Sequence, residues 1–257
     1  MTFLIDTHAH LDFEPLSIDI EKTINDAKEA GIEKIIIPGV TINDLDKIIA
    51  LVDKYDCLYG AVGLHPSEAK SWDENSYKTL KEFAKHPKII AIGEIGLDYH
   101  WDNSFNEIQK HVFTQQIRLA KELKKPVIIH DREAHQDILN ILIETSANEI
   151  GGVMHCFSGS AEFALQCIKL NFYIALGGPV TFKNAKKPKE VAKEVPLENL
   201  VLETDSPYLT PHPYRGKTNS PHLIRLVAEE IAGIKKLPFD EVAKITTLNA
   251  KKLFFNI

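Results

Sequence analysis

Eight short runs rich in Ile, Val and Leu recur along the 257 residues, and a polar–apolar segment long enough for a helix follows each run. This alternation is typical of βα units that build a parallel sheet. The predicted strands are 3–7, 34–38, 58–64, 89–95, 126–130, 152–155, 172–176 and 200–204. Parallel strands with right-handed helical crossovers close most simply into a (β/α)8 barrel, an α/β fold, and an open doubly wound sheet is the alternative.

The helical segments support the same arrangement. The clearest is 106–124, where apolar residues recur near a period of 3.6 among Lys and Glu. Segments 221–233 and 239–255 predict the last barrel helix and a C-terminal helical addition. Because no linker divides the chain, and a (β/α)8 barrel takes about 250 residues, we expect residues 1–257 to form a single domain.

Composition narrows the class of protein. No apolar run approaches the ~18 residues of a membrane span, and the N-terminus lacks the basic and apolar stretches of a secretion signal. We therefore expect a cytoplasmic protein with no membrane partner. Cys57, Cys156 and Cys167 form no C-x-x-C pair and read as reduced thiols. A net charge of −6 argues against broad electrostatic coating of nucleic acid.

Polar side chains collect where the predicted strands end. Four histidines and two acids lie at these ends: His8, His10, Glu94, His130, His155 and Asp205. In a barrel the carboxyl ends of the strands surround one mouth, where the active site lies. Such a group is hard to bury unless a cation holds it. Six ligands are more than one tetrahedral zinc needs. A two-metal site, in which Glu94 bridges the ions, is therefore favoured and a one-metal site is not.

Strand alternation places further side chains. Glu203 shares a face with Asp205, so we expect both to point into the barrel. Cys156 would point away from the mouth as a packed thiol rather than a nucleophile. His65 ends the third strand facing the site, while the ligand set is complete without it. We expect it to bind substrate phosphate or to support the ligands.

Six ordered sequence blocks resemble the TatD-like deoxyribonucleases, a branch of the amidohydrolase superfamily of metal-dependent barrel hydrolases. The blocks are DTHAHL at 6–11, GLHP at 63–66, GEIGLDY at 93–99, HDR at 130–132, HCFSG at 155–159 and LETDSPY at 202–208. The resemblance spans nearly the whole chain. It implies two divalent ions, one held by His8, His10, Glu94 and Asp205 and the other by Glu94, His130 and His155. It also places Glu203 beside the metals, where an additional ion is conceivable.

The resemblance implies cleavage of phosphodiester bonds in DNA, at its ends, by a water that the two metals activate. We expect Asp205 to accept or orient the proton, with Glu94 and Glu203 beside it in the catalytic group. Arg132 and His65 are expected to hold phosphate oxygens. Tyr99, like Trp101, lies in a loop near the expected mouth and is a candidate to stack on a nucleobase, which would favour single-stranded ends.

Other activities fit the same residues. A small-molecule hydrolase of the superfamily would cleave a lactone, amide or phosphotriester, and such enzymes often bridge the metals with a modified Lys. The only lysines near the fifth strand, Lys124 and Lys125, precede its N-terminal end and so lie far from the mouth. They cannot bridge the metals, which favours the nuclease. Hydrolysis of an aminoacyl ester on RNA is a related alternative, and a non-enzymatic metal-binding scaffold is a third. The imidazole and carboxylate ligands suit Mg, Mn, Co or Zn. We expect a monomer or weak oligomer.

Overall fold

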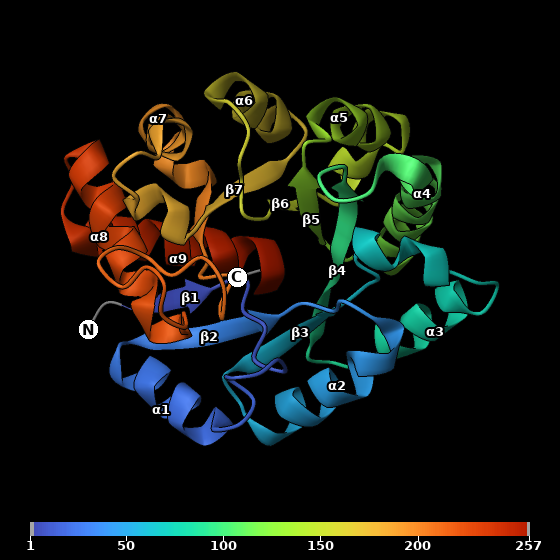
Figure 1. Ribbon diagram of the computed structural model, residues 1–257, viewed down its shortest axis with the longest axis horizontal. Helices are drawn as coiled ribbons and strands as arrows, with labels where there is room; N and C mark the ends of the chain where they lie inside the picture. Colours follow the sequence, from blue (N-terminus) through green and yellow to red (C-terminus); the bar gives the residue numbers. More distant parts are fainter. Residues whose placement is uncertain (1–2, 256–257) are drawn as a thin grey trace. The chain divides into compact units, whose positions relative to one another are not determined.

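Strands and helices alternate along the chain in a computed structural model that describes residues 3–255 (Figure 1). The strands are β1 (Leu4–Asp6), β2 (Ile32–Ile37), β3 (Leu58–Val62), β4 (Ile89–Asp98), β5 (Val127–Arg132), β6 (Gly152–Met154), β7 (Phe172–Leu176) and β8 (Leu200–Leu202). They follow chain order in one eight-stranded sheet, and the pairings β1–β2, β3–β4, β4–β5, β5–β6 and β7–β8 are parallel. The predicted (β/α)8 barrel class is confirmed.

The predicted helical segments 106–124 and 239–255 correspond to helices of the structure. The helices are α1 (Ile20–Glu29), α2 (Leu45–Lys54), α3 (Ser76–Phe83), α4 (Asn106–Leu123), α5 (His135–Glu144), α6 (Ala161–Lys169), α7 (Lys186–Glu194), α8 (Ile224–Lys235) and α9 (Phe239–Phe255). The predicted helix 221–233 begins instead as the 3₁₀ turn Pro221–Leu223, and α8 then continues it. The predicted C-terminal addition is α9.

Seven of the eight strands differ in their bounds from the prediction, and β7 alone matches it. The differences at β4, β1 and β8 bear on the site. β4 continues past the predicted end at residue 95, because its pairing with β5 runs on through Gly96–His130 to Asp98–Arg132. β1 and β8 end earlier, at Asp6 and Leu202. The polar residues after β1 and β8 therefore lie on loop backbone, where strand alternation does not decide which way a side chain points.

The chain comprises two compact units. Unit 2 consists of Pro38–His155 and Gln166–Tyr173. It contains β3 to β6, and α2 to α5 lie along one side of these strands (Figure 1). Its core is formed by aliphatic side chains that are fully removed from solvent, among them Val62, Ile92 and Ile129.

Two buried glutamines of α4 form hydrogen bonds with the backbone near the ends of β3 and β4 in unit 2. Gln116 accepts a hydrogen bond from the Leu64 backbone N–H (2.7 Å) and donates to the Leu64 carbonyl oxygen (3.0 Å). Gln109 makes the same pair of bonds with the backbone of Asp98, at 2.8 and 2.9 Å. Each amide thus satisfies one backbone N–H and one backbone carbonyl at the end of a strand or just after it. The backbone that carries His65 and Asp98 is held in place as a result.

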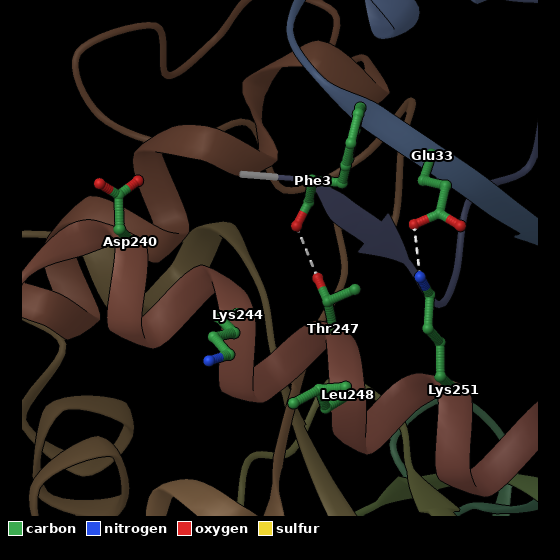
Figure 2. A pocket seen from close by; sticks show the side chains of 7 residues that line it. All are labelled: Phe3, Glu33, Asp240, Lys244, Thr247, Leu248 and Lys251. Atoms are coloured by element: carbon green, nitrogen blue, oxygen red, sulfur yellow. Dashed lines mark hydrogen bonds and ion pairs between the residues drawn. The ribbon is translucent and has the colours of Figure 1, made fainter. Parts of the chain in front are cut away.

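Unit 1 combines the described parts of Met1–Ile37 and Ile174–Ile257 with Cys156–Leu165. Here α9 packs on β1 and β8. The Thr247 hydroxyl donates to the carbonyl oxygen of Phe3 at 2.8 Å, and Lys251 pairs with Glu33 at 2.7 Å, as Figure 2 shows. The added helix therefore covers the end of unit 1 where β1 begins.

The single domain that the sequence predicts stays a prediction. Within residues 3–255, no helix combines the length and the apolar character needed to cross a membrane. The predicted cytoplasmic location stays a prediction as well.

Replacement of Gly96 by Ala is expected to destabilise the protein. Gly96 has a φ of +144°, and a Cβ there would collide with the carbonyl oxygen of His130. Strain and overpacking together predict a loss of roughly 2–4 kcal/mol in the free energy of unfolding, measured by urea denaturation.

Gly233→Ala is the matched control. This glycine lies inside α8 with nothing within 4 Å of an added Cβ, so the variant is expected to gain up to about 1 kcal/mol through helix propensity. Equal stability of the Gly96 variant and the wild type would contradict the close approach of β4 to β5.

Candidate metal centre

In unit 1, two imidazoles and one carboxylate face one another. The Nε2 atoms of His8 and His10 are 3.3 Å apart, and they lie 3.8 and 3.5 Å from Oδ1 of Asp205. Ligands about 2.1 Å from a tetrahedral zinc are roughly 3.4 Å from one another. Both histidines are buried, while 14% of the Asp205 side chain is exposed. The three groups are spaced as ligands of one ion, and solvent reaches the carboxylate.

Loop backbone brings these three residues together. The Asp205 N–H donates to the His8 carbonyl oxygen (2.9 Å), and the His10 N–H donates to the carbonyl oxygen of Ser206 (2.8 Å). Asp205 itself has a left-handed φ of +54°. The sequence argument derived these positions from strand alternation, but β1 and β8 end before them. The cluster depends instead on hydrogen bonds between the two loops.

Asp6 holds the two loops in register. Its buried carboxylate accepts hydrogen bonds from the Thr204 N–H (2.9 Å) and hydroxyl (2.6 Å) and from the His8 N–H (3.3 Å). Burial raises the pKa of Asp6 to about 7, against the lowering effect of these bonds. Sequence reasoning missed this role, although Asp6 opens the motif that contains both histidines.

Glu203 is buried near this cluster, and its carboxylate binds backbone. Oε1 of Glu203 accepts a hydrogen bond from the Cys156 N–H at 2.7 Å. The Cys156 thiol is half-buried, and the residue has a left-handed φ of +43°. A catalytic role for Glu203 stays a prediction, and its observed bond shapes the turn after β6.

In unit 2, three imidazoles surround the carboxylate of Glu94. Its Oε1 lies 2.7 Å from Nδ1 of His130, 3.6 Å from Nε2 of His155 and 3.6 Å from Nε2 of His65. Glu94 is only 3% exposed. The structure thus brings the predicted ligands of unit 2 together. It also places His65, which the sequence argument left outside the ligand set, next to them.

The hydrogen bonds of His65 decide which of its nitrogens carries the proton. The Ser67 backbone N–H donates to Nδ1 of His65 at 3.2 Å. Nδ1 must therefore be an acceptor, so the neutral imidazole carries its proton on Nε2, the atom that faces Glu94. A protonated Nε2 cannot coordinate a metal, but it can donate to a carboxylate or phosphate oxygen.

Asp98 lies on the other side of the His130 ring. Its Oδ2 is 3.0 Å from Nε2 of His130. Burial lowers the pKa of His130, but hydrogen bonds to Asp98 and Glu94 outweigh it and raise the pKa to about 9. A carboxylate behind an imidazole orients that ligand and increases its basicity. Sequence reasoning missed Asp98, although Glu94, Gly96 and Asp98 share one face of β4 by the period of two.

The two remaining predicted substrate residues contact groups other than Glu94. Arg132 is exposed, and its guanidinium lies 5.2 Å from the centre of the Trp101 ring. The Tyr99 hydroxyl donates to Asp137 of α5 at 2.7 Å. Burial and Asp137 both raise the pKa of Tyr99. A substrate contact from Tyr99 stays a prediction.

The donor sets fit divalent metal ions. Each unit offers a carboxylate with at least two imidazoles within 4 Å. Nitrogen and oxygen donors of this kind suit Zn, Mn or Co, and the carboxylates also admit Mg. The His65 ring packs against His130 with ring centres 4.5 Å apart, which places its Nε2 donor beside these candidate ligands.

Comparison with known proteins agrees with this chemistry. The profile of a family described as TatD related DNase matches residues 5–255. The uncharacterized metal-dependent hydrolase YabD of Bacillus subtilis is 51% identical over 251 residues, which cover 98% of each chain. The uncharacterized metal-dependent hydrolase YcfH of Escherichia coli is 37% identical over 255 residues, 98% of this chain and 96% of that one. The crystal structure of YjjV, a TatD homologue from Escherichia coli, matches with a TM-score of 0.94 at 34% identity, over 99% of this chain and 98% of that one.

Metal binding is expected to release a proton from His130. Its pKa of about 9 means that the metal-free ring is protonated at pH 7, whereas a ligand must be neutral. Calorimetry in buffers of different ionisation enthalpy should therefore count close to one proton from His130 at pH 7. The release should vanish as the pH rises above 9, and the apparent affinity should fall as the pH drops below it.

Asp98→Asn removes one of the two carboxylates that raise this pKa, so this variant should release less proton at pH 7. At pH 9 its metal affinity should be roughly 10–100-fold weaker, since His130 loses its orienting partner. Asp53→Asn is the matched control, because Asp53 pairs with His86 on the surface at 3.0 Å. Identical proton release by Asp98→Asn and wild type would refute the assignment.

Proposed function

Since the chain belongs to the family of TatD-related DNases, we propose that this metal-dependent hydrolase is a deoxyribonuclease that shortens DNA from single-stranded ends. The observation that carries the proposal is the Glu94 cluster. One carboxylate oxygen lies within 3.6 Å of three imidazole nitrogens, and one of those imidazoles presents an N–H instead of a lone pair. A site of this kind combines metal ligands with a donor for an anionic substrate oxygen.

Two ions would be held, one by each cluster. His8, His10 and Asp205 would hold one ion in unit 1, and Glu94, His130 and His155 would hold another in unit 2. Divalent ions supply two things for phosphodiester cleavage: a water of lowered pKa and neutralisation of charge on the phosphoryl oxygens. The prediction that Glu94 also serves the ion of unit 1 is testable by counting ions.

The residues of the chain supply proton transfer and orientation. Asp205 accepts or orients the proton of the attacking water, because its carboxylate is the ligand of unit 1 that solvent reaches. His65 donates from Nε2 to a phosphate oxygen, and Arg132 adds a charged donor. No side-chain nucleophile is required, which agrees with the role of Cys156 as a turn residue.

The first experiment separates this proposal from its rival, a hydrolase of small-molecule or aminoacyl esters. The protein is stripped with a chelator, and Mg, Mn or Zn is restored separately. Labelled single-stranded DNA, a chromogenic phosphodiester and an ester are then assayed in parallel. Stepwise, metal-dependent shortening of DNA supports the nuclease, and the position of the label gives the polarity. Cleavage of the ester with intact DNA would replace the nuclease by the rival.

Asp205→Asn is expected to lower DNA cleavage by roughly 10²–10⁴-fold, the contribution of a positioned general base. The amide keeps the size of the side chain, so the fold should persist by circular dichroism. Asp56→Asn, on the surface, is the control and should retain wild-type activity. Near wild-type cleavage by the Asp205 variant, with unchanged metal content, would rule out the role of Asp205.

Glu94→Ala is expected to abolish cleavage, a loss of at least roughly 10³-fold, since electrostatic stabilisation and metal binding disappear together. Metal content by mass spectrometry adds a second result. Loss of both ions would support Glu94 as a shared ligand, whereas loss of one ion would confine it to the cluster of unit 2. Retention of both ions and of activity would contradict the proposed centre.

A further inference from the structure

A cavity of about 330 Å³ lies in unit 2 and plays no part in the reaction described above. The 3₁₀ turn Pro66–Ser71, the end of β4, the loop that follows β4 and the start of α4 contribute its lining. Ser67, Lys70, Asp98, Trp101 and Phe105 are among the lining residues. The lining therefore combines the aromatic rings of Trp101 and Phe105 with the charged groups of Lys70 and Asp98.

Two lining residues connect this cavity to the Glu94 cluster. Asp98 lines it and lies 3.0 Å from Nε2 of His130. Ser67 lines it, and its hydroxyl lies 2.8 Å from Nδ1 of His65. A substrate whose phosphate is bound by His65 therefore has this cavity beside it, one residue contact away through Ser67.

Trp101 offers an unusually accessible aromatic face. The residue is 76% exposed, although water solvates an indole poorly. The Arg132 guanidinium lies 5.2 Å from its ring centre, and the His100 ring meets it edge-on at 4.8 Å. An exposed aromatic ring beside a cation is the arrangement by which proteins bind unpaired nucleobases, because every base has a face that can stack.

The charges of the cavity suit a sugar–phosphate chain. Lys70 lies over the Phe105 ring with its ammonium 4.2 Å from the centre, and it pairs with the exposed carboxylate of Asp102 at 3.3 Å. Asp102 also accepts from the Ser104 N–H, and Asp98 faces His130. Both acids of the lining thus have partners inside the protein, Lys70 lines the cavity, and Arg132 lies beside it against the Trp101 ring, so these two side chains are the cations offered to the phosphates of a bound strand.

We propose that Trp101 is the stacking platform of a nucleobase subsite, in which the cavity takes an unpaired base adjacent to the scissile phosphodiester while Arg132 and Lys70 contact the backbone. This inference rests on the proposed nuclease function and deepens it. It makes single-stranded ends the preferred substrate, because a paired base is not free to stack on a protein ring. Trp101 is therefore a specificity residue and takes no part in bond cleavage.

The test combines protein variants with substrates that lack a base. Wild type, Trp101→Ala and Trp101→Phe are compared on single-stranded oligonucleotides that are intact or carry one abasic residue at the first, second or third position from the cleaved end. Trp101→Ala should lower kcat/KM roughly tenfold or more on the intact strand, and Trp101→Phe should retain most activity. At the abasic position that the subsite serves, wild type and Trp101→Ala should become equal.

Trp72→Phe supplies both a control and a direct measurement of binding. The chain has only two tryptophans. Trp72 packs against the apolar cluster of Leu64, Ala69, Phe105 and Val112 and is not among the residues that line the cavity. This variant should keep wild-type kcat/KM and leave Trp101 as its one indole. Quenching of that indole by an intact oligonucleotide, but not by the abasic one, would report stacking without any need for turnover.

The outcomes separate the subsite from the nuclease. If DNA is cleaved but Trp101→Ala loses activity equally on intact and abasic strands, or loses none, the subsite is overturned and the nuclease stands. If no metal restores DNA cleavage, the nuclease falls, and the quenching experiment then decides the subsite alone. Absence of quenching by any oligonucleotide overturns the subsite in either case.

Discussion

The surrounding structure has to compensate the buried carboxylate of Glu94. A charge removed from water costs several kcal/mol unless partners compensate it, and Glu94 is 3% exposed. Three imidazoles meet its oxygen, and the chain behind them is fixed by the side-chain amides of Gln109 and Gln116. The apolar barrel strands and α4 thus provide a rigid frame for a cluster that is unfavourable without cations.

Further carboxylates bond to the candidate ligands and to the loops that carry them. His130 lies between Glu94 and Asp98, and Asp6 is bonded to the loop of Asp205 through Thr204. Neither Asp98 nor Asp6 is among the expected ligands. Asp98 orients the His130 ring, and Asp6 fixes the backbone of the loops that carry His8 and Asp205.

A division of labour follows from the hydrogen bonds of His65. Since the Ser67 N–H donates to Nδ1, the opposite nitrogen of His65 is a donor directed at Glu94, whereas His130 and His155 face the same carboxylate as candidate metal ligands. The turn that carries Ser67 also lines the cavity under Trp101. Through Ser67, the turn Pro66–Ser71 contacts both His65 of the Glu94 cluster and this cavity.

The sequence by itself determined the alternation of strands and helices, because hydrophobic periodicity is local, and it placed the candidate ligands at strand ends. Tertiary structure alone decided how His65 and Asp98 enter the cluster, why Tyr99 is bonded to α5, and how the loops of His8 and Asp205 meet. The physical reason is that these contacts join residues distant in the chain or lie beyond a strand's end. There side-chain direction depends on hydrogen-bond partners, which no periodicity encodes.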